Sequence, residues 1–227
     1  MERLHCRVAT TPQELNEAKG REMQPLQLTL GKENWSLYMR RKVDPTFRPV
    51  RDRIFRRDQY TCQFCGFQAH EYQEILNLDH DYRHNKASNM VTACCLCAQA
   101  HFFEMVGQAG FGGGRLIYLP EMSQAELNGF CHVVFCAMTN GTNYRDSAQS
   151  IYRTLKFRAQ PVEERLGLGS SDPAVLGRML LEYQGKNAET LLSATLSDIR
   201  LLASYPKFKK QLLAWAEAAS KELAATG

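Results

Sequence analysis

The sequence lacks the long hydrophobic segments that a transmembrane protein needs. No run approaches the roughly 18 uninterrupted apolar residues of a membrane-spanning helix. The first residues, from Met1 to Cys6, also lack the apolar core of a signal peptide. We therefore expect a protein of the reducing cytosol with no membrane span, where paired cysteines bind metal or do redox chemistry more often than they form structural disulfides.

The usual marks of a nucleotide- or nucleic-acid-binding protein are also weak. The net charge is only +4, which permits contact with nucleic acid or an acidic partner but requires neither. Residues 110–114 are rich in glycine, but no Gly-Lys-Ser/Thr follows them, so they are not a phosphate-binding loop. We expect a flexible turn there, before a strand at residues 116–119.

Two cysteine pairs are the most informative feature that is present. Cys62 and Cys65 form one pair, and Cys94 and Cys97 form the other, each with two residues between its members. Two thiolates at this spacing hold one face of a Zn²⁺ ion, and two such pairs complete a tetrahedron. The segment between the pairs is longer than the roughly 15–20 residues of a simple zinc ribbon. The sequence predicts one structural Zn²⁺ per chain.

The other cysteines are expected to lie outside the metal site. Cys95 does not have the two-residue spacing to Cys97, so its side chain should point elsewhere. Cys131 and Cys136 lie in an apolar run and are predicted to be small buried residues. Cys6 carries no clear signal. A thioredoxin-like site is disfavoured because no βαβ unit is visible.

The N-terminal half reads as mixed strand and helix. The first 25 residues are polar and are predicted to form a loop. Two alternating runs, residues 26–30 and 35–39, suggest a β-hairpin. Residues 40–60 hold eight Lys/Arg and three Asp, a balance of 8 − 3 = +5. A helix opening at Pro49 would present this charge as a phosphate-binding face or as an ordinary solvated face.

The C-terminal half reads as helical. Ser123 and Glu126 form a capping box, which predicts a helix that ends near Thr139. Further helices are predicted from Ser147 to about Leu166, from Pro173 onward, and over residues 188–225 with a break at Pro206. The expected class is α+β, with a metal-binding unit at residues 1–119 and a helical unit at residues 120–227.

The segment between the cysteine pairs could do chemistry. Asp79 and His80 follow a strand predicted at residues 75–78, and Asn89 lies in the polar loop beyond. At a strand end, an aspartate can bind a divalent cation, and a neutral imidazole can take a proton from water. An asparagine could orient that base. An Asp-His pair is equally consistent with a surface turn, so both interpretations stay open.

Several motifs resemble the zinc-stabilised HNH endonuclease module. They are residues 56–66, the Leu78-Asp79-His80 run, residues 88–91 and the second cysteine pair. The resemblance implies a ββα-metal core with Asp79 as metal ligand, His80 as general base and Asn89 as the orienting residue. The family places a histidine directly after the fourth cysteine, where this chain has Ala98, and His101 comes one helical turn later. We therefore expect no intact nuclease centre.

A second resemblance covers nearly the whole chain. Residues 60–69, 91–95, 112–121 and 151–153 are similar to the IcmJ/DotN proteins of Dot/Icm type IV secretion systems. This implies a cytoplasmic, non-catalytic zinc-binding subunit that joins the coupling complex by binding the coupling ATPase DotL. Such a subunit would lie at the inner membrane through that complex. The alternative hypothesis is an HNH-type metal-dependent DNA endonuclease.

Overall fold

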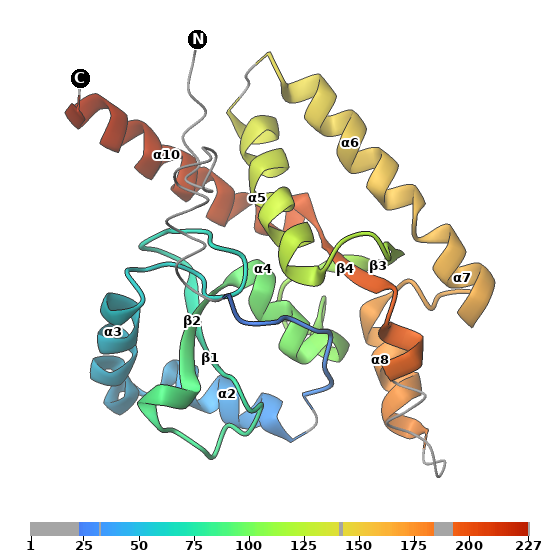
Figure 1. The fold of residues 1–227 in the computed structure, drawn as a ribbon, viewed down its shortest axis with the longest axis horizontal. Helices are drawn as coiled ribbons and strands as arrows, with labels where there is room; N and C mark the ends of the chain where they lie inside the picture. Colours follow the sequence, from blue (N-terminus) through green and yellow to red (C-terminus); the bar gives the residue numbers. More distant parts are fainter. Residues whose placement is uncertain (1–22, 32, 141–142, 184–192, 227) are drawn as a thin grey trace.

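The structure is a computed structural model and describes residues 23–31, 33–140, 143–183 and 193–226 (Figure 1). Its main α-helices are α2 (Asn34–Val43), α3 (Arg48–Arg57), α5 (Gln124–Thr139), α6 (Arg145–Phe157), α7 (Gln160–Leu166), α8 (Pro173–Glu182) and α10 (Lys209–Thr226). The strands are β1 (Gln73–Asn77), β2 (Met90–Cys94), β3 (Gly114–Tyr118) and β4 (Ile199–Ala203). Shorter helical turns are η1 (Pro45–Phe47), η2 (Ala87–Asn89), α4 (Cys95–Ala98), η3 (Gln99–Met105) and η4 (Tyr205–Phe208). The fold is therefore mixed helix and sheet, as the sequence predicts.

Two small antiparallel sheets organise the chain. In the first, β1 pairs with β2, with Gln73 opposite Cys94 at one end and Asn77 opposite Met90 at the other. In the second, β3 pairs with β4. Strands of five residues rise about 3.4 Å per residue, so the ends of the first sheet lie about 14 Å apart. The second cysteine pair begins at the last residue of β2, at one end of this sheet, and Asp79 and His80 follow β1 at the other end.

The elements gather into two neighbouring groups around one core. α2, α3, β1 and β2 lie together, and α5, α6, α7 and α8 surround the sheet of β3 and β4 (Figure 1). One cluster of buried side chains runs through both groups, from Leu26 to Trp215. A smaller cluster, which includes Ile54 and Phe55, lies between α3 and the first sheet. The division into residues 1–119 and 120–227 stays a prediction, and β3 and β4 pair across it.

The predicted N-terminal hairpin is wrong. Residues 35–39 belong to α2, and the segment of residues 23–31 is extended without a strand partner in the described part of the chain. The alternation was misleading because Trp35 and Tyr38 are also one helical turn apart. Both rings contact Phe102, at centroid distances of 5.4 and 4.8 Å. These contacts with Phe102 stabilise the helical conformation of residues 35–39.

Two of the predicted helix starts are confirmed, and two predicted helical segments differ from the structure. α3 has Pro49 in its first turn and buries Ile54 and Phe55. α5 begins with the predicted capping box. The helix predicted from Ser147 to Leu166 is two helices, α6 and α7, with Pro161 in the first turn of α7. The prediction of helix alone over residues 188–225 is wrong, because β4 lies there. No helix in the described ranges is long and apolar enough to cross a bilayer.

Candidate metal centre

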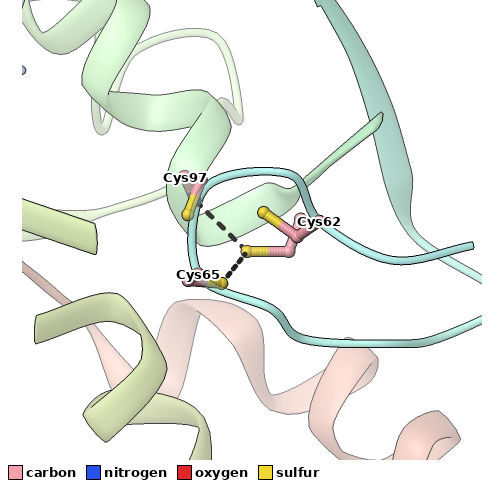
Figure 2. Close-up of side chains that lie close together, drawn as sticks. Cys62, Cys65 and Cys97 are labelled. Atoms are coloured by element: carbon pink, nitrogen blue, oxygen red, sulfur yellow. Dashed lines mark hydrogen bonds between the residues drawn. The ribbon is translucent and has the colours of Figure 1, made fainter. Parts of the chain in front are cut away.

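The four cysteines with ligand spacing lie together. Their sulfur atoms are all within 4.8 Å of one another. Cys62 and Cys65 come from the loop before β1, and Cys97 comes from α4 (Figure 2). The sulfurs of Cys65 and Cys94 are 3.7 Å apart. Around a tetrahedral Zn²⁺ with bonds of about 2.3 Å, sulfurs are about 3.8 Å apart. The cluster therefore fits this ion in size and in donor type.

Local backbone geometry brings each pair together. After Cys65 the chain turns back at Gly66, whose φ of 75° is a left-handed conformation that glycine adopts without strain. The amide of Gly66 donates to the carbonyl of Cys62 at 3.0 Å. In the second pair, Cys94 is the N-cap of α4, and its sulfur accepts a hydrogen bond from the amide of Cys97 at 3.4 Å. A tight turn therefore brings the first pair together, and the start of a helix brings the second pair together.

Burial makes a metal ion chemically favourable here. Cys62, Cys94 and Cys97 are fully buried. Burial raises the pKa of the Cys94 and Cys97 thiols well above the ordinary value, because a thiolate without compensation is costly in the interior. A divalent cation among the four sulfurs supplies that compensation. As predicted, Cys95 lies outside the cluster, and Cys131 and Cys136 are buried.

Helix α5 contacts the cysteine cluster, a contact that the sequence does not predict. Asn128 Nδ2 donates to Cys97 Sγ at 3.3 Å, and His132 Nε2 lies 3.2 Å from Cys94 Sγ. Burial lowers the pKa of His132 to about 3, so its ring is neutral. The available signal was two polar residues four apart, Asn128 and His132, in the mostly apolar part of the helix after its first turn. Such a signal does not say which surface the helix packs against.

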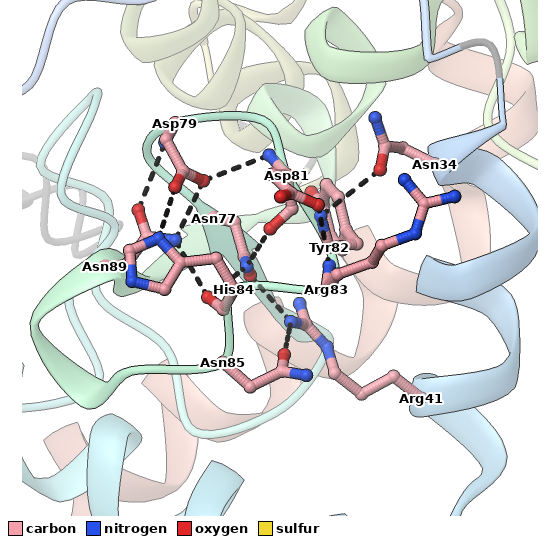
Figure 3. Close-up of polar contacts among 10 residues, drawn as sticks. All are labelled: Asn34, Arg41, Asn77, Asp79, Asp81, Tyr82, Arg83, His84, Asn85 and Asn89. Atoms are coloured by element: carbon pink, nitrogen blue, oxygen red, sulfur yellow. Dashed lines mark hydrogen bonds and ion pairs between the residues drawn. The ribbon is translucent and has the colours of Figure 1, made fainter.

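Asp79 and Asn89 lie together and close the loop between β1 and β2 (Figure 3). Asp79 Oδ1 accepts from Asn89 Nδ2 at 2.8 Å and from the amide of Asp81 at 3.0 Å. Asp79 Oδ2 lies 2.5 Å from His84 Nδ1. In return, Asn89 Oδ1 accepts from the amide of Asp79 at 3.1 Å. Both oxygens of this carboxylate are engaged within the loop.

His80 makes its contacts elsewhere. Its ring stacks on that of His101, with centroids 4.2 Å apart and planes 28° apart. Its Nδ1 lies 3.3 Å from Thr29 Oγ1 in the extended segment. Burial lowers the pKa of His80, and it lowers the pKa of the more deeply buried His101 well below the ordinary value. Both rings are therefore neutral at physiological pH.

The four cysteines are the one group of three or more His, Cys, Asp or Glu side chains in the described part of the chain that could share a metal ion. Ala98 is buried at the end of the short α4. The helical path then breaks at Phe102, with φ −143° and ψ 50°. His101 meets His80, but the two rings and Asp79 do not come together as a second metal-binding group.

Comparison with known proteins places the chain in a family. No family model matches it. It is 54% identical over 199 residues to the Type 4 apparatus protein DotN of Legionella pneumophila. The match covers 88% of this chain and 92% of that relative, so it includes both the cysteine cluster and most of the helices. The chain belongs to the DotN (IcmJ) family of the Dot/Icm type IV secretion systems.

Proposed function

We propose that this chain is a non-catalytic, zinc-binding subunit of a type IV secretion coupling complex. In this role it binds the coupling ATPase DotL and helps to assemble the platform that recruits effectors. The observation that carries the proposal is 54% identity across 88% of the chain to a protein named as a type 4 apparatus component. The proposed location is the cytoplasm, at the inner membrane through the complex.

The proposed role of Zn²⁺ is architectural. Cys62 and Cys65 would bind it from the loop before β1, and Cys94 and Cys97 from the end of β2 and from α4. A four-sulfur site leaves no open position for water or substrate, which is the arrangement of structural zinc. The ion would tie the loop, the sheet and the helical turn into one unit.

We interpret the order β1, β2, α4 as an HNH-like ββα core that has lost its reaction centre. Asp79 has both carboxylate oxygens in hydrogen bonds or ion pairs within its loop. His80 is stacked on a buried ring. The helical element after β2 has four residues before η3 begins. These features support the interpretation that the core is a scaffold for binding a partner protein.

The direct test is co-purification. The full chain and a tagged DotL-type coupling ATPase from the same organism are co-expressed, and the complex is separated by affinity and size-exclusion chromatography. We expect the two to elute together in a fixed ratio. A tagged unrelated ATPase is the control. Separate elution of two well-folded proteins would refute the coupling-complex role.

The alternative function is a metal-dependent HNH-type DNA endonuclease. It is favoured by the positions of Asp79, His80 and Asn89 around the end of β1. Supercoiled plasmid is incubated with the protein and Mg²⁺ or Mn²⁺, beside the His80→Ala variant and an exposed control, His70→Ala. We expect no nicking. Nicking that needs the metal and is lost only in His80→Ala would establish the endonuclease instead.

A further inference from the structure

Helix α5 presents two N–H donors to the second cysteine pair. Asn128 Nδ2 lies 3.3 Å from Cys97 Sγ, and His132 Nε2 lies 3.2 Å from Cys94 Sγ. The two residues are four apart, so they lie one above the other on the same helix face. Each is 1% exposed. The two contacts are buried. They reach Cys94, the N-cap of α4, and Cys97, within its single turn.

The surroundings of His132 place its proton. Either nitrogen of an imidazole can carry a hydrogen, and the partner of each nitrogen decides which one does. Nδ1 is buried and meets no hydrogen-bond partner within the described residues. Nε2 faces a sulfur atom, which as a thiolate can only accept. The tautomer with hydrogen on Nε2 is therefore the one that forms a bond, and His132 acts as a donor to Cys94.

Donors are needed at this position for an electrostatic reason. Four thiolates around one divalent cation leave excess negative charge, and burying charge is costly unless hydrogen bonds satisfy it. The amide of Cys97 supplies one donor to Cys94 Sγ. The side chains of α5 add one more donor to each cysteine of the second pair. Outer donors of this kind fix the orientation of metal ligands and tune their hold on the ion.

We propose that Asn128 and His132 are positioning residues of the zinc site: their N–H groups hold the thiolates of Cys97 and Cys94 and slow release of the metal. The inference rests on the proposed zinc site and extends it to α5. On this proposal, the stability of the zinc site depends on α5, a helix that lies outside the HNH-like segment.

His132 has a second role that the test must separate. Its ring stacks on Phe67, with centroids 3.6 Å apart and planes 5° apart. It also lies against Trp215, at 5.4 Å. His132→Phe keeps a flat ring in this stack but removes the donor. His132→Gln keeps an N–H near the position of Nε2 but removes the ring. The pair of variants distinguishes hydrogen bonding from packing.

The experiment measures zinc release from the full chain. Zinc content is determined by mass spectrometry, and release is followed with the chromogenic chelator 4-(2-pyridylazo)resorcinol. We expect His132→Phe to release zinc at least about 10-fold faster than wild type, the usual scale for loss of an outer donor. His132→Gln should stay closer to wild type. Val133→Ala, at an exposed site on the same helix, should match wild type.

Asn128→Leu provides an independent variant if His132→Phe does not fold. It keeps nearly the same shape and removes the N–H donor without adding a charge; it also removes the acceptor that Asn128 Oδ1 offers to Gln124 Nε2 at 2.9 Å. Faster release is expected here as well. Wild-type release in the folded variants, or equal acceleration in His132→Phe and His132→Gln, would overturn the inference. Wild-type protein that binds no zinc would instead overturn the proposed zinc site, and that result is seen before any variant is made.

Discussion

The imidazole rings of His80 and His101 are stacked, with their centroids 4.2 Å apart. His101 is 4% exposed, and its Nδ1 is buried without a partner among the described residues. Two protonated rings at this distance would repel each other in a poorly solvated site. The pair therefore cannot hold two charges, and burial lowers the pKa of both rings further. A histidine that must stay uncharged is suited to packing and makes folding sensitive to acid.

The first prediction concerns this acid sensitivity. Burial lowers the pKa of His101 in the folded chain, while the unfolded chain has the ordinary value of about 6.5. Below that pH the unfolded state binds more protons, so the stability is present above about pH 6.5 and is lost as pH falls. One such group contributes up to about 1.4 kcal/mol per pH unit. His101→Phe should flatten the fall in the free energy of unfolding between pH 8 and 5.5, measured in urea.

A matched control tests that reasoning. His70 is an exposed histidine, and His70→Gln is the matched control for the loss of one imidazole. Zinc content is measured at each pH, so that loss of metal is not mistaken for protonation of His101. If His101→Phe and wild type lose stability in parallel, the acid sensitivity comes from other groups.

The second prediction concerns the contact between α8 and η3. Gly177 packs closely against Glu104. A Cβ atom added to Gly177 would lie 2.6 Å from the Cα of Glu104 and 2.3 Å from its Cβ. Alanine favours a helix by up to about 1 kcal/mol over glycine, but forcing packed backbones apart costs roughly 1–3 kcal/mol. Gly177→Ala should therefore lower the free energy of unfolding. Arg178→Ala, at the exposed neighbouring position, should have little effect in the same urea titration.

The sequence predicts features that depend on neighbouring residues. The cysteine spacing predicts that the four sulfurs lie together, and the capping box predicts the start of α5. Features that depend on packing between distant parts of the chain cannot be predicted from local sequence patterns. β4 is a strand because it pairs with β3, far away in the chain. Asn128 and His132 contact the cysteines because α5 packs there, which no local pattern records.

The third prediction concerns removal of the metal. We expect about one zinc per chain, and its removal should loosen the packing of α10. Trp215 contacts Phe67 at 4.7 Å, and its Nε1 donates to the carbonyl of Glu71 at 3.0 Å. Phe67 lies two residues after Cys65, beyond Gly66, so its position depends on that turn. Structural zinc contributes to folding itself, and chelation should therefore release these contacts.

Tryptophan fluorescence measures this loosening. A Trp35→Phe background leaves Trp215 as the single tryptophan, because the chain has two. Its emission should shift to longer wavelength when a chelator removes the metal, and the same shift should appear in Cys94→Ser without a chelator. Cys95→Ser, outside the cluster, should retain both zinc and the wild-type emission. Well-folded wild-type protein without zinc would contradict the prediction.

The fourth prediction concerns Arg41, which joins α2 to the first sheet. Its guanidinium donates to Asn77 Oδ1 at 2.6 Å, to Asn85 Oδ1 at 3.0 Å and to the carbonyl of Ile75 at 2.8 Å. It also lies over the ring of Tyr82, 4.7 Å from its centroid. Lysine keeps the charge but cannot reproduce the planar fork or the stacking.

Hydrogen bonds from a charged donor contribute roughly 1.5–3 kcal/mol each, and lysine should recover only part of them. Arg41→Lys should therefore lower the free energy of unfolding by about 1–3 kcal/mol in urea. Arg40→Lys is the matched control, because Arg40 is the exposed neighbour on the same helix. If the two variants unfold at the same urea concentration, the fork of Arg41 does not hold the loop. A loss confined to Arg41→Lys would mean that α2 orders the segment carrying Asp79 and His84, independently of the cysteine cluster at the other end of the sheet.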